Sequence, residues 1–324
     1  MNRTRLYCGG HLVDENFPPD EVSTRLGADE DAVAWLDLCH PTAEELNLVA
    51  AEFGLHQLAV KSVVEAAQRA KLDRYDTHLF LTSYMVRLDP DGGVSANEMA
   101  AFITPRALIT VRQDDSFDID ELLLRWDENA ELAEHGVAFL LHGLLDLIVD
   151  CHFTAVQQLD STFEKLEDKL FEDKNTSLGE VQRRALHHRR DLVRLRQVAL
   201  PMREVVNSVM RPTMHIVDAP MLPYYQDVYD HILRVIEWTE SLRDLITTML
   251  DANLMVQSNQ MNLTVKKVTS WAAIIAVPTA ITSFFGQNLA FPWRHTDTEF
   301  YLTAALTVGL AFVLYVVFRR KSWL

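Results

Sequence analysis

Small and hydroxyl-bearing side chains follow one face of an uncharged segment near the C-terminus. Their spacing alternates between four and three residues, which keeps them on one side of a helix. The members are Val265, Thr269, Ala272, Ala276, Thr279 and Ser283. Such a face can line a path for ions. A tight helix–helix interface in a membrane also favours small residues, so both interpretations stay open.

The sequence Gly286-Gln287-Asn288 follows this face where the uncharged helix should end. Glycine can end a helix in the left-handed conformation, and Asn288 would then offer a neutral amide beside the end of the path. An ordinary turn would account for the same three residues.

Acidic residues recur every seven positions just before the uncharged segment. They are Asp230, Glu237, Asp244 and Asp251. On a helix they share one side, where they could concentrate cations. A solvated face with partners such as Arg234 and Arg243 explains the same pattern.

Other chemistries have weaker support in the sequence. The cysteines Cys8, Cys39 and Cys151 lack metal-ligand spacing, which favours reduced thiols. His187 and His188 lie in the basic run RRALHHRR, a poor setting for a metal ion. The sequence has no glycine-rich phosphate loop, nucleophile elbow or convincing catalytic pair, so we expect neither an enzyme nor a cofactor. A formal net charge of −16 argues against a nucleic-acid partner.

Two uncharged runs are long enough to cross a bilayer, which takes about 20 apolar helical residues. They predict transmembrane helices at 268–288 and 299–318, joined by an external loop at 289–298. The run Val137 to Val149 is shorter and contains His142 and Asp146, so we expect it to be a buried core helix.

Flanking charge predicts the orientation of these helices. Lys266 and Lys267 precede the first, and the basic tail 319–324 follows the second. The positive-inside rule places both flanks in the cytoplasm. The N-terminus carries no signal-peptide pattern. We therefore expect a multi-pass protein of the cell (inner) membrane with cytoplasmic N- and C-termini.

The sequence patterns that precede the membrane segments predict an α+β membrane protein. Strand patterns at 33–38, 77–88 and 98–113, with a helix capped by Thr42 and Glu45, indicate a mixed α/β domain at 1–118. Helices from Ile119 to about Asp173 and from Leu178 to Met210 would form a helical hairpin within 119–223.

A stalk helix at 224–267 should continue into the first membrane helix. Neither glycine nor proline occurs between Tyr224 and Val277. From Tyr224 to Gly286 the helix would span roughly 95 Å. Such a helix needs neighbours along its length, and two membrane helices cannot enclose a pore alone, so we expect an oligomer.

The C-terminal third resembles the CorA family of magnesium transporters, the two-helix class with a Gly-x-Asn motif. The resemblance rests on PYYQDVYDHILRVIEWTESLRDLITTMLDANLMVQSNQMN, the proline-bearing first membrane helix, Gly286-x-Asn288 and the ending RRKSWL. Weaker similarity extends back through LVRLRQVALPMREVV and FGLHQLAVKSVVEAAQRAKLDRYDTHLFL. Together, the stronger and weaker stretches cover nearly the whole chain.

This resemblance implies a homopentameric funnel with five first membrane helices around the pore and five second helices outside them. Gly286, Gln287 and Asn288 would form the selectivity filter, and Asp251 would help bind regulatory metal between subunits. The implied pore-lining residues, with Ser283 added from the small-residue face, are Asn262, Val265, Val268, Ala272, Ala276, Thr279 and Ser283. Mg²⁺ would be the transported ion and also the intracellular gating ion, with cobalt and nickel as further cargo.

Three features depart from the family pattern. Gln287 replaces the usual Met, and Ala272 and Ala276 are small where some relatives have large apolar residues. Lys61–Ser62 replaces an acidic pair, so Lys61 could form a gating salt bridge to the Asp251 of a neighbouring subunit, and Glu65 could serve as a substitute metal ligand. The alternatives are a zinc-preferring or proton-coupled relative, and a non-conducting membrane-anchored scaffold or sensor.

Overall fold

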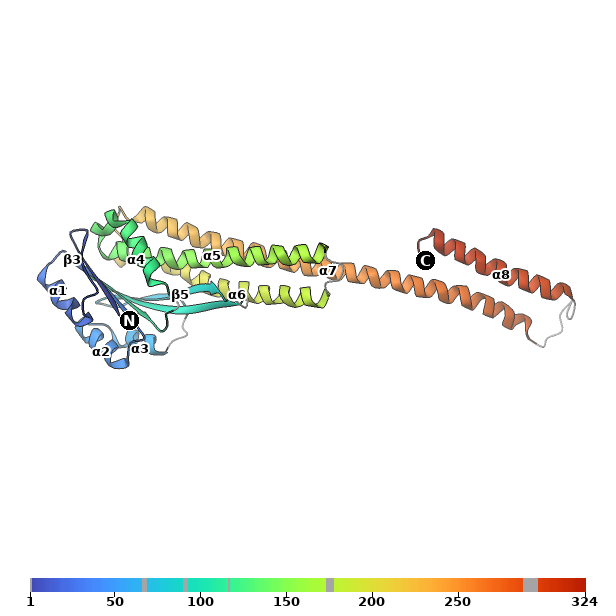
Figure 1. Cartoon of the computed structure of the whole chain (residues 1–324), viewed down its shortest axis with the longest axis horizontal. Helices are drawn as coiled ribbons and strands as arrows, with labels where there is room; N and C mark the ends of the chain where they lie inside the picture. The colour runs from blue at the N-terminus through green and yellow to red at the C-terminus, as the bar shows by residue number, and fades with distance from the viewer. Residues whose placement is uncertain (1, 66–68, 90–92, 116, 173–177, 288–296) are drawn as a thin grey trace. The chain divides into compact units, whose positions relative to one another are not determined.

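The computed structural model describes residues 2–65, 69–89, 93–115, 117–172, 178–287 and 297–324 (Figure 1). The chain divides into two compact units, residues 1–246 and 247–324. Helix α7 (Leu222–Phe285) is one continuous helix of 64 residues that contributes to both units.

The first unit contains a seven-stranded sheet with the order β2-β1-β3-β7-β6-β5-β4. The strands are β1 (Arg3–Cys8), β2 (His11–Glu15), β3 (Ala32–Cys39), β4 (Lys71–Arg74), β5 (Leu79–Leu88), β6 (Val94–Ile103) and β7 (Ala107–Arg112). Strands β3 and β7 are parallel neighbours, and the other described pairs are antiparallel. The carboxyl ends of β3 and β7 therefore meet at one edge.

Helices cover both faces of this sheet (Figure 1). Successive strand residues point to opposite faces, so Leu79 and Leu81 join one core, whereas Phe80 joins the other. The second core is covered by α1 (Val22–Ala28), α2 (Ala43–Glu52) and α3 (Gln57–Glu65). The first is covered by α4 (Ile119–Glu128), α5 (Val137–Glu172), α6 (Leu178–Val209) and the first turns of α7.

Several local predictions are confirmed. Thr42 caps α2 by accepting a hydrogen bond from the Glu45 N–H (3.2 Å), and the Glu45 carboxylate accepts one from the Thr42 N–H (2.8 Å). This reciprocal pair is the predicted capping box. Strand β3 contains the strand predicted at 33–38. Helix α6 ends at Val209, one residue before the predicted end at Met210.

The predicted single helix from Ile119 to about Asp173 is wrong. The chain forms α4, then a 3₁₀ turn at Ala130–His135, and then α5. Gly136 lies at the break with φ 59° and ψ −127°, a conformation that favours glycine. The break lets α4 fold back on α5, and the Trp126 indole N–H donates to the Leu140 carbonyl at 3.2 Å.

Other boundaries also differ from the predictions. The apolar stretch 98–113 forms parts of two strands, because Thr104 closes a tight turn to Ala107. Helix α7 begins at Leu222, so Pro223 lies in its first turn, where a missing N–H costs no intrahelical bond. The sequence patterns did not identify β1, β2, β4, α1 or α3 as separate elements.

Helix α5 is a core helix, as its interrupted apolar run predicts. By length and composition, three described helices could cross a membrane, within 137–168, 222–285 and 300–320. The most apolar part of the first is 67% buried inside the protein, against 6% and 0% for the others. His152 ties α5 to β5 through a 2.8 Å contact between Nε2 and the Tyr84 carbonyl, and burial lowers its pKa to about 4, which keeps it neutral.

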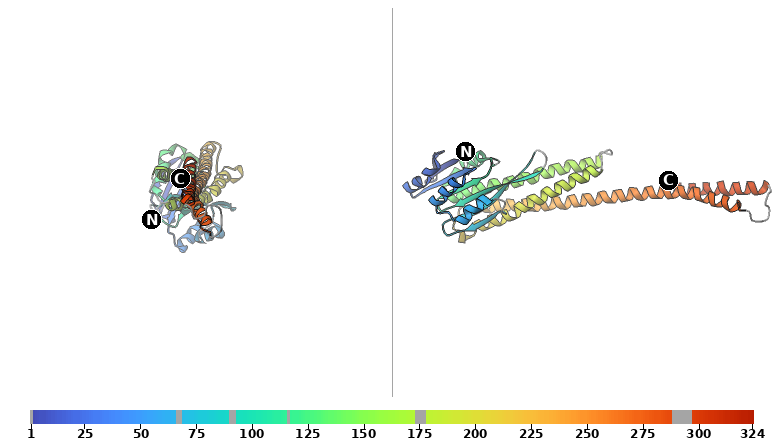
Figure 2. Two further views of the ribbon diagram at one scale, coloured as in Figure 1. Left: turned by 90° about the vertical axis from the view of Figure 1, so that its right-hand side faces the viewer. Right: turned by 90° about the horizontal axis from the view of Figure 1, so that it is seen from below.

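The second unit consists of the C-terminal part of α7 and α8 (Asp297–Arg320). Both views show α8 alongside the end of α7 (Figure 2). At 24 residues, α8 is about 36 Å long, enough to cross a hydrocarbon core of about 30 Å. Large apolar side chains such as Val268, Ile275 and Phe312 are more than half exposed in the isolated chain. The exposed apolar surface fits lipid or neighbouring helices better than water.

Candidate functional site

The predicted pore-lining positions are all exposed on α7. They are Asn262, Val265, Val268, Ala272, Ala276, Thr279 and Ser283. A second set on the same helix is buried or half-buried. Its members are Ser270, Ala273, Ile274, Val277, Pro278, Ile281 and Phe285. The exposed set is therefore a surface that α8 leaves free.

The two sets lie on opposite sides of the helix. Each residue of an α-helix turns by about 100°, so the centres of the two sets are roughly 180–200° apart. Helix α8 has a matching half-buried stripe at Thr303, Thr307, Ala311 and Leu314. Packing of α7 against α8 thus uses one face of α7 and leaves the small, hydroxyl-bearing face available.

Several hydroxyl groups on α7 are hydrogen-bonded within the helix, and one of them, that of Thr279, belongs to the predicted pore-lining set. The Thr279 hydroxyl donates to the Ile275 carbonyl at 2.8 Å, and the Thr282 hydroxyl to the Pro278 carbonyl at 3.1 Å. Ser270 makes the same contact with Lys266 at 2.7 Å. A satisfied hydroxyl donor can enter the membrane at low cost. Its oxygen still has acceptor capacity for the waters of an ion.

The helix ends at Phe285, directly before the Gly-x-Asn motif. The Gly286 N–H donates to the Thr282 carbonyl at 2.9 Å, and the Gln287 N–H to the Phe284 carbonyl at 3.3 Å. Gly286 does not adopt the left-handed conformation that a helix-ending glycine can take. An added Cβ there would lie 3.0 Å from the Thr282 carbonyl oxygen, so close approach explains the glycine. Asn288 lies outside the described residues.

The candidate regulatory residues belong to different units. Lys61 and Glu65 form an exposed ion pair within α3, with Nζ 3.2 Å from Oε1. Asp251 is exposed on α7 in the second unit. The other three acids of the seven-residue pattern are also exposed, but they lie in the first unit. Asp244 pairs with Arg243 at 3.1 Å, which matches the interpretation of a solvated face at that position. Lys61 thus has a local partner within its own helix.

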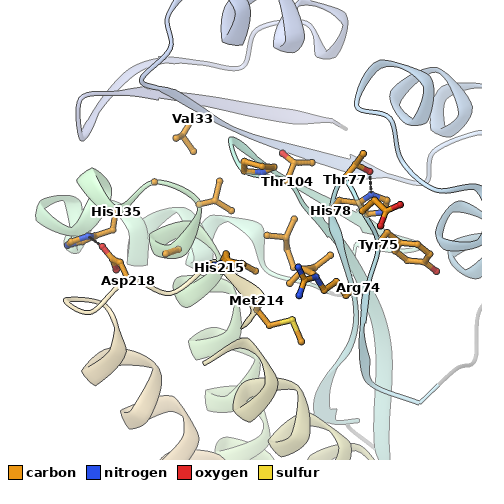
Figure 3. Close-up of a pocket in the computed structure, with 18 of the residues that line it drawn as sticks. Val33, Arg74, Tyr75, Thr77, His78, Thr104, His135, Met214, His215 and Asp218 are labelled. Carbon is orange, nitrogen blue, oxygen red and sulfur yellow. Dashed lines mark hydrogen bonds and ion pairs between the residues drawn. The ribbon is translucent and has the colours of Figure 1, made fainter. Parts of the chain in front are cut away.

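A cavity of about 790 Å³ in the first unit contains none of these residues (Figure 3). Arg74, Tyr75 and His78 line it together with His135 and Asp218, which form a 2.7 Å pair between Nδ1 and Oδ2. His78 accepts or donates a 2.9 Å hydrogen bond with the Thr77 hydroxyl. These histidines have partners of their own.

One cluster of metal-ligating side chains was missed by the sequence patterns. In the part of the chain that the structure describes, Cys39, His40 and Asp115 place one ligand atom each within 4.8 Å of one another. The sequence signal was the adjacent Cys39–His40 pair at the end of a strand. Spacing alone could not reveal Asp115, which is 75 residues further along the chain.

Comparison with known proteins gives a consistent result over the full length. Residues 30–320 match the family described as CorA-like Mg²⁺ transporter protein. The cobalt/magnesium transport protein CorA of Thermotoga maritima is 26% identical over 302 residues, covering 91% of this chain and 85% of that protein. The CorA protein of Methanocaldococcus jannaschii is 25% identical over 318 residues, covering 97% of each.

Solved structures share the fold. The complete structure of the Methanocaldococcus jannaschii CorA magnesium transporter superposes with a TM-score of 0.76 at 22% identity, covering 99% of this chain and 98% of that one. The structure of the full-length CmaX protein gives a TM-score of 0.70 at 19% identity, covering 99% and 97%. The predicted α+β membrane fold with a long helix leading into C-terminal membrane helices is confirmed. By its matched span and its architecture, the chain belongs to the CorA-like Mg²⁺ transporter family.

Proposed function

We propose that this chain is one subunit of a channel that admits Mg²⁺ to the cytoplasm, driven by the membrane potential. The observation that carries this proposal is the free face of α7, which is small, hydroxyl-bearing and turned away from α8. Relatives named as cobalt/magnesium and magnesium transport proteins support the choice of ion. Cobalt and nickel are the further divalent ions that we expect to pass.

The path we propose runs from the Gly286–Asn288 filter down the free face of α7. Asn288 would bind the hydrated ion through the waters that Mg²⁺ retains. Weak, water-mediated binding permits release into the path. The inside-negative potential contributes about 4.6 kcal/mol per 100 mV to a divalent cation that crosses the whole field.

Complementation tests this function in cells. Expression should restore growth in low Mg²⁺ to cells that lack their own Mg²⁺ uptake systems. Competition by Co²⁺, Ni²⁺ and Zn²⁺ in the same cells then ranks the ions. A Zn²⁺ preference or a requirement for a proton gradient would instead favour the zinc-preferring or proton-coupled alternative. Wild-type expression in the membrane without any uptake would favour a scaffold or sensor.

A homopentamer is the assembly that we propose, with both termini in the cytoplasm. Helix α7 is about 96 Å long, and most of its C-terminal surface is exposed in one chain. Exposed apolar residues on α2 and α3, including Leu48, Leu58 and Val64, offer further contact surface.

The purified, detergent-solubilised protein should have the mass of five chains in light scattering. The apolar face of each α7 then gains partners that the single chain lacks. Cross-linking in native membranes provides the control for dissociation by detergent. A stable monomer or dimer that still transports Mg²⁺ would contradict the pentamer.

Gating by intracellular Mg²⁺ should be weaker here than in relatives with two acids at the Lys61–Ser62 position. We propose that Lys61 acts as a tethered cation for the Asp251 of a neighbouring subunit. It would leave its exposed intrahelical pair with Glu65 to do so, which costs little because exposed pairs contribute only about 0–1 kcal/mol.

Lys61→Glu should open the channel in metal-free buffer and strengthen closure by internal Mg²⁺. The substitution removes the tethered cation and adds a carboxylate ligand beside Glu65. Flux at several internal Mg²⁺ concentrations measures both effects, with Lys71→Glu on β4 as a control for the charge change. An unchanged Mg²⁺ dose-response would rule out this location for the regulatory site.

A further inference from the structure

Three metal-ligating side chains meet where the parallel strands β3 and β7 end. Cys39 is the last residue of β3 and pairs in register with Arg112, the last residue of β7. His40 follows β3, and Asp115 lies three residues after Arg112. In sheets with parallel strands, ligands bind outside the carboxyl ends. We propose that Cys39, His40 and Asp115 bind a thiophilic divalent cation, Zn²⁺ or Co²⁺.

The backbone holds the three residues together. The His40 N–H donates to the Arg112 carbonyl at 3.0 Å, which joins the two chain segments beyond the last strand pair. His40 has φ 52°, a left-handed conformation that is uncommon for a residue with a side chain. The Cys39 N–H donates to the Asn2 side chain at 3.2 Å. These hydrogen bonds hold the backbone of Cys39 and His40 in place and so fix the positions from which their side chains extend.

The thiol and the carboxylate are already in contact. Cys39 Sγ lies 3.1 Å from Asp115 Oδ1, with the thiol as donor. A metal ion that replaces the thiol proton would bind a thiolate and a carboxylate, which together balance its two positive charges. The nearby Arg112 cation does not upset this balance, because its Nε donates to the fully buried Asp37 at 2.9 Å.

Arg112 also positions one of the ligands. Its Nη1 donates to Asp115 Oδ1 at 3.0 Å, which leaves Oδ2 for the metal. Hydrogen bonds from outside the coordination sphere commonly orient metal-bound carboxylates in this way. The carboxylate thus has one oxygen fixed by the protein and one available.

The donor set selects the metal. A thiolate and an imidazole favour Zn²⁺ or Co²⁺, whereas Mg²⁺ requires an oxygen environment. Ligand atoms on a tetrahedral zinc ion are about 3.4–3.6 Å apart, so the separations of up to 4.8 Å must shorten by about 1 Å. His40 is exposed and can make that movement by turning its ring. Water would complete the coordination.

Titration of the full-length protein with Co²⁺ in detergent tests the site. A thiolate bound to Co²⁺ gives a charge-transfer absorption band, and the three cysteines of the chain all precede residue 152. Ions in the proposed membrane path therefore do not contribute to this band. We expect one such site per chain, lost in Cys39→Ser and at least about tenfold weaker in His40→Ala and Asp115→Asn.

Matched controls separate this site from general thiol chemistry. Cys8→Ser and Cys151→Ser should leave the band unchanged, Zn²⁺ should displace Co²⁺, and a large excess of Mg²⁺ should not. His40→Ala and Asp115→Asn change exposed side chains, so they remain informative if Cys39→Ser disturbs folding. Three results would overturn the proposal: a band that survives Cys39→Ser, Co²⁺ affinity in His40→Ala and Asp115→Asn equal to that of the wild type, or no band in the wild type. None of these results depends on whether the protein conducts Mg²⁺.

Discussion

Replacing Asn288 by alanine is expected to abolish selective Mg²⁺ uptake while leaving the oligomer assembled. The amide is the proposed partner of the waters around the ion, and alanine offers no group to accept their hydrogen bonds. Asn288 follows the last residue of α7 in the sequence, so the substitution leaves every residue of that helix unchanged. Mg²⁺ flux into liposomes, together with Co²⁺ and Na⁺ flux, measures both rate and selectivity.

Asn259→Ala is the matched control for this experiment. Asn259 lies on α7 and is exposed, but helix geometry places it on the side away from the proposed path. Its loss should leave flux and ion preference as in the wild type. If Asn288→Ala itself keeps wild-type flux and ion preference, the filter assignment is wrong.

Cysteines placed on the free face of α7 should make the channel sensitive to charged thiol reagents. We expect modified Thr279→Cys and Ser283→Cys proteins to fall to the flux of protein-free liposomes, because a bulky charge would then occupy a narrow path on every subunit. Both side chains are exposed in the single chain and share a face with Ala272 and Ala276.

The opposite face of the same helix provides the comparison. Ile274→Cys and Ile281→Cys lie on the half-buried side that packs towards α8, so their modification should leave most of the flux. The native cysteines precede the membrane helices, and their replacement by serine removes background reaction. Equal block from both faces would mean that the free face is a helix–helix interface, the interpretation that the small residues alone also allowed.

The sequence predicts the membrane part of the fold well, because its signals are local. The absence of charge over 268–293 and of glycine and proline over 224–277 suffices to predict a helix that continues from the stalk into the membrane. Helix α7 has this extent. The free face is predictable for the same reason, because residues spaced three and four positions apart lie on the same face of a helix.

The first unit depends on contacts that no local pattern encodes. Gly136 separates two helical segments in a region that has no proline. It does so with a positive φ of 59°, which the turn between these segments requires. The parallel pairing of β3 with β7 brings Cys39 next to Asp115 across 75 intervening positions. The two residues lack metal-ligand spacing in the chain, and only the pairing of β3 with β7 brings them together.

Uptake of Mg²⁺ into liposomes that contain the purified protein, at a series of imposed membrane potentials, measures the proposed potential-driven transport itself. We expect inward flux without nucleotide or a proton gradient, and flux that rises as the interior is made more negative. Protein-free liposomes and liposomes with Asn288→Ala should show only leakage. Wild-type liposomes that take up no Mg²⁺ at any potential, while the protein is correctly assembled and inserted, would contradict the proposed transport.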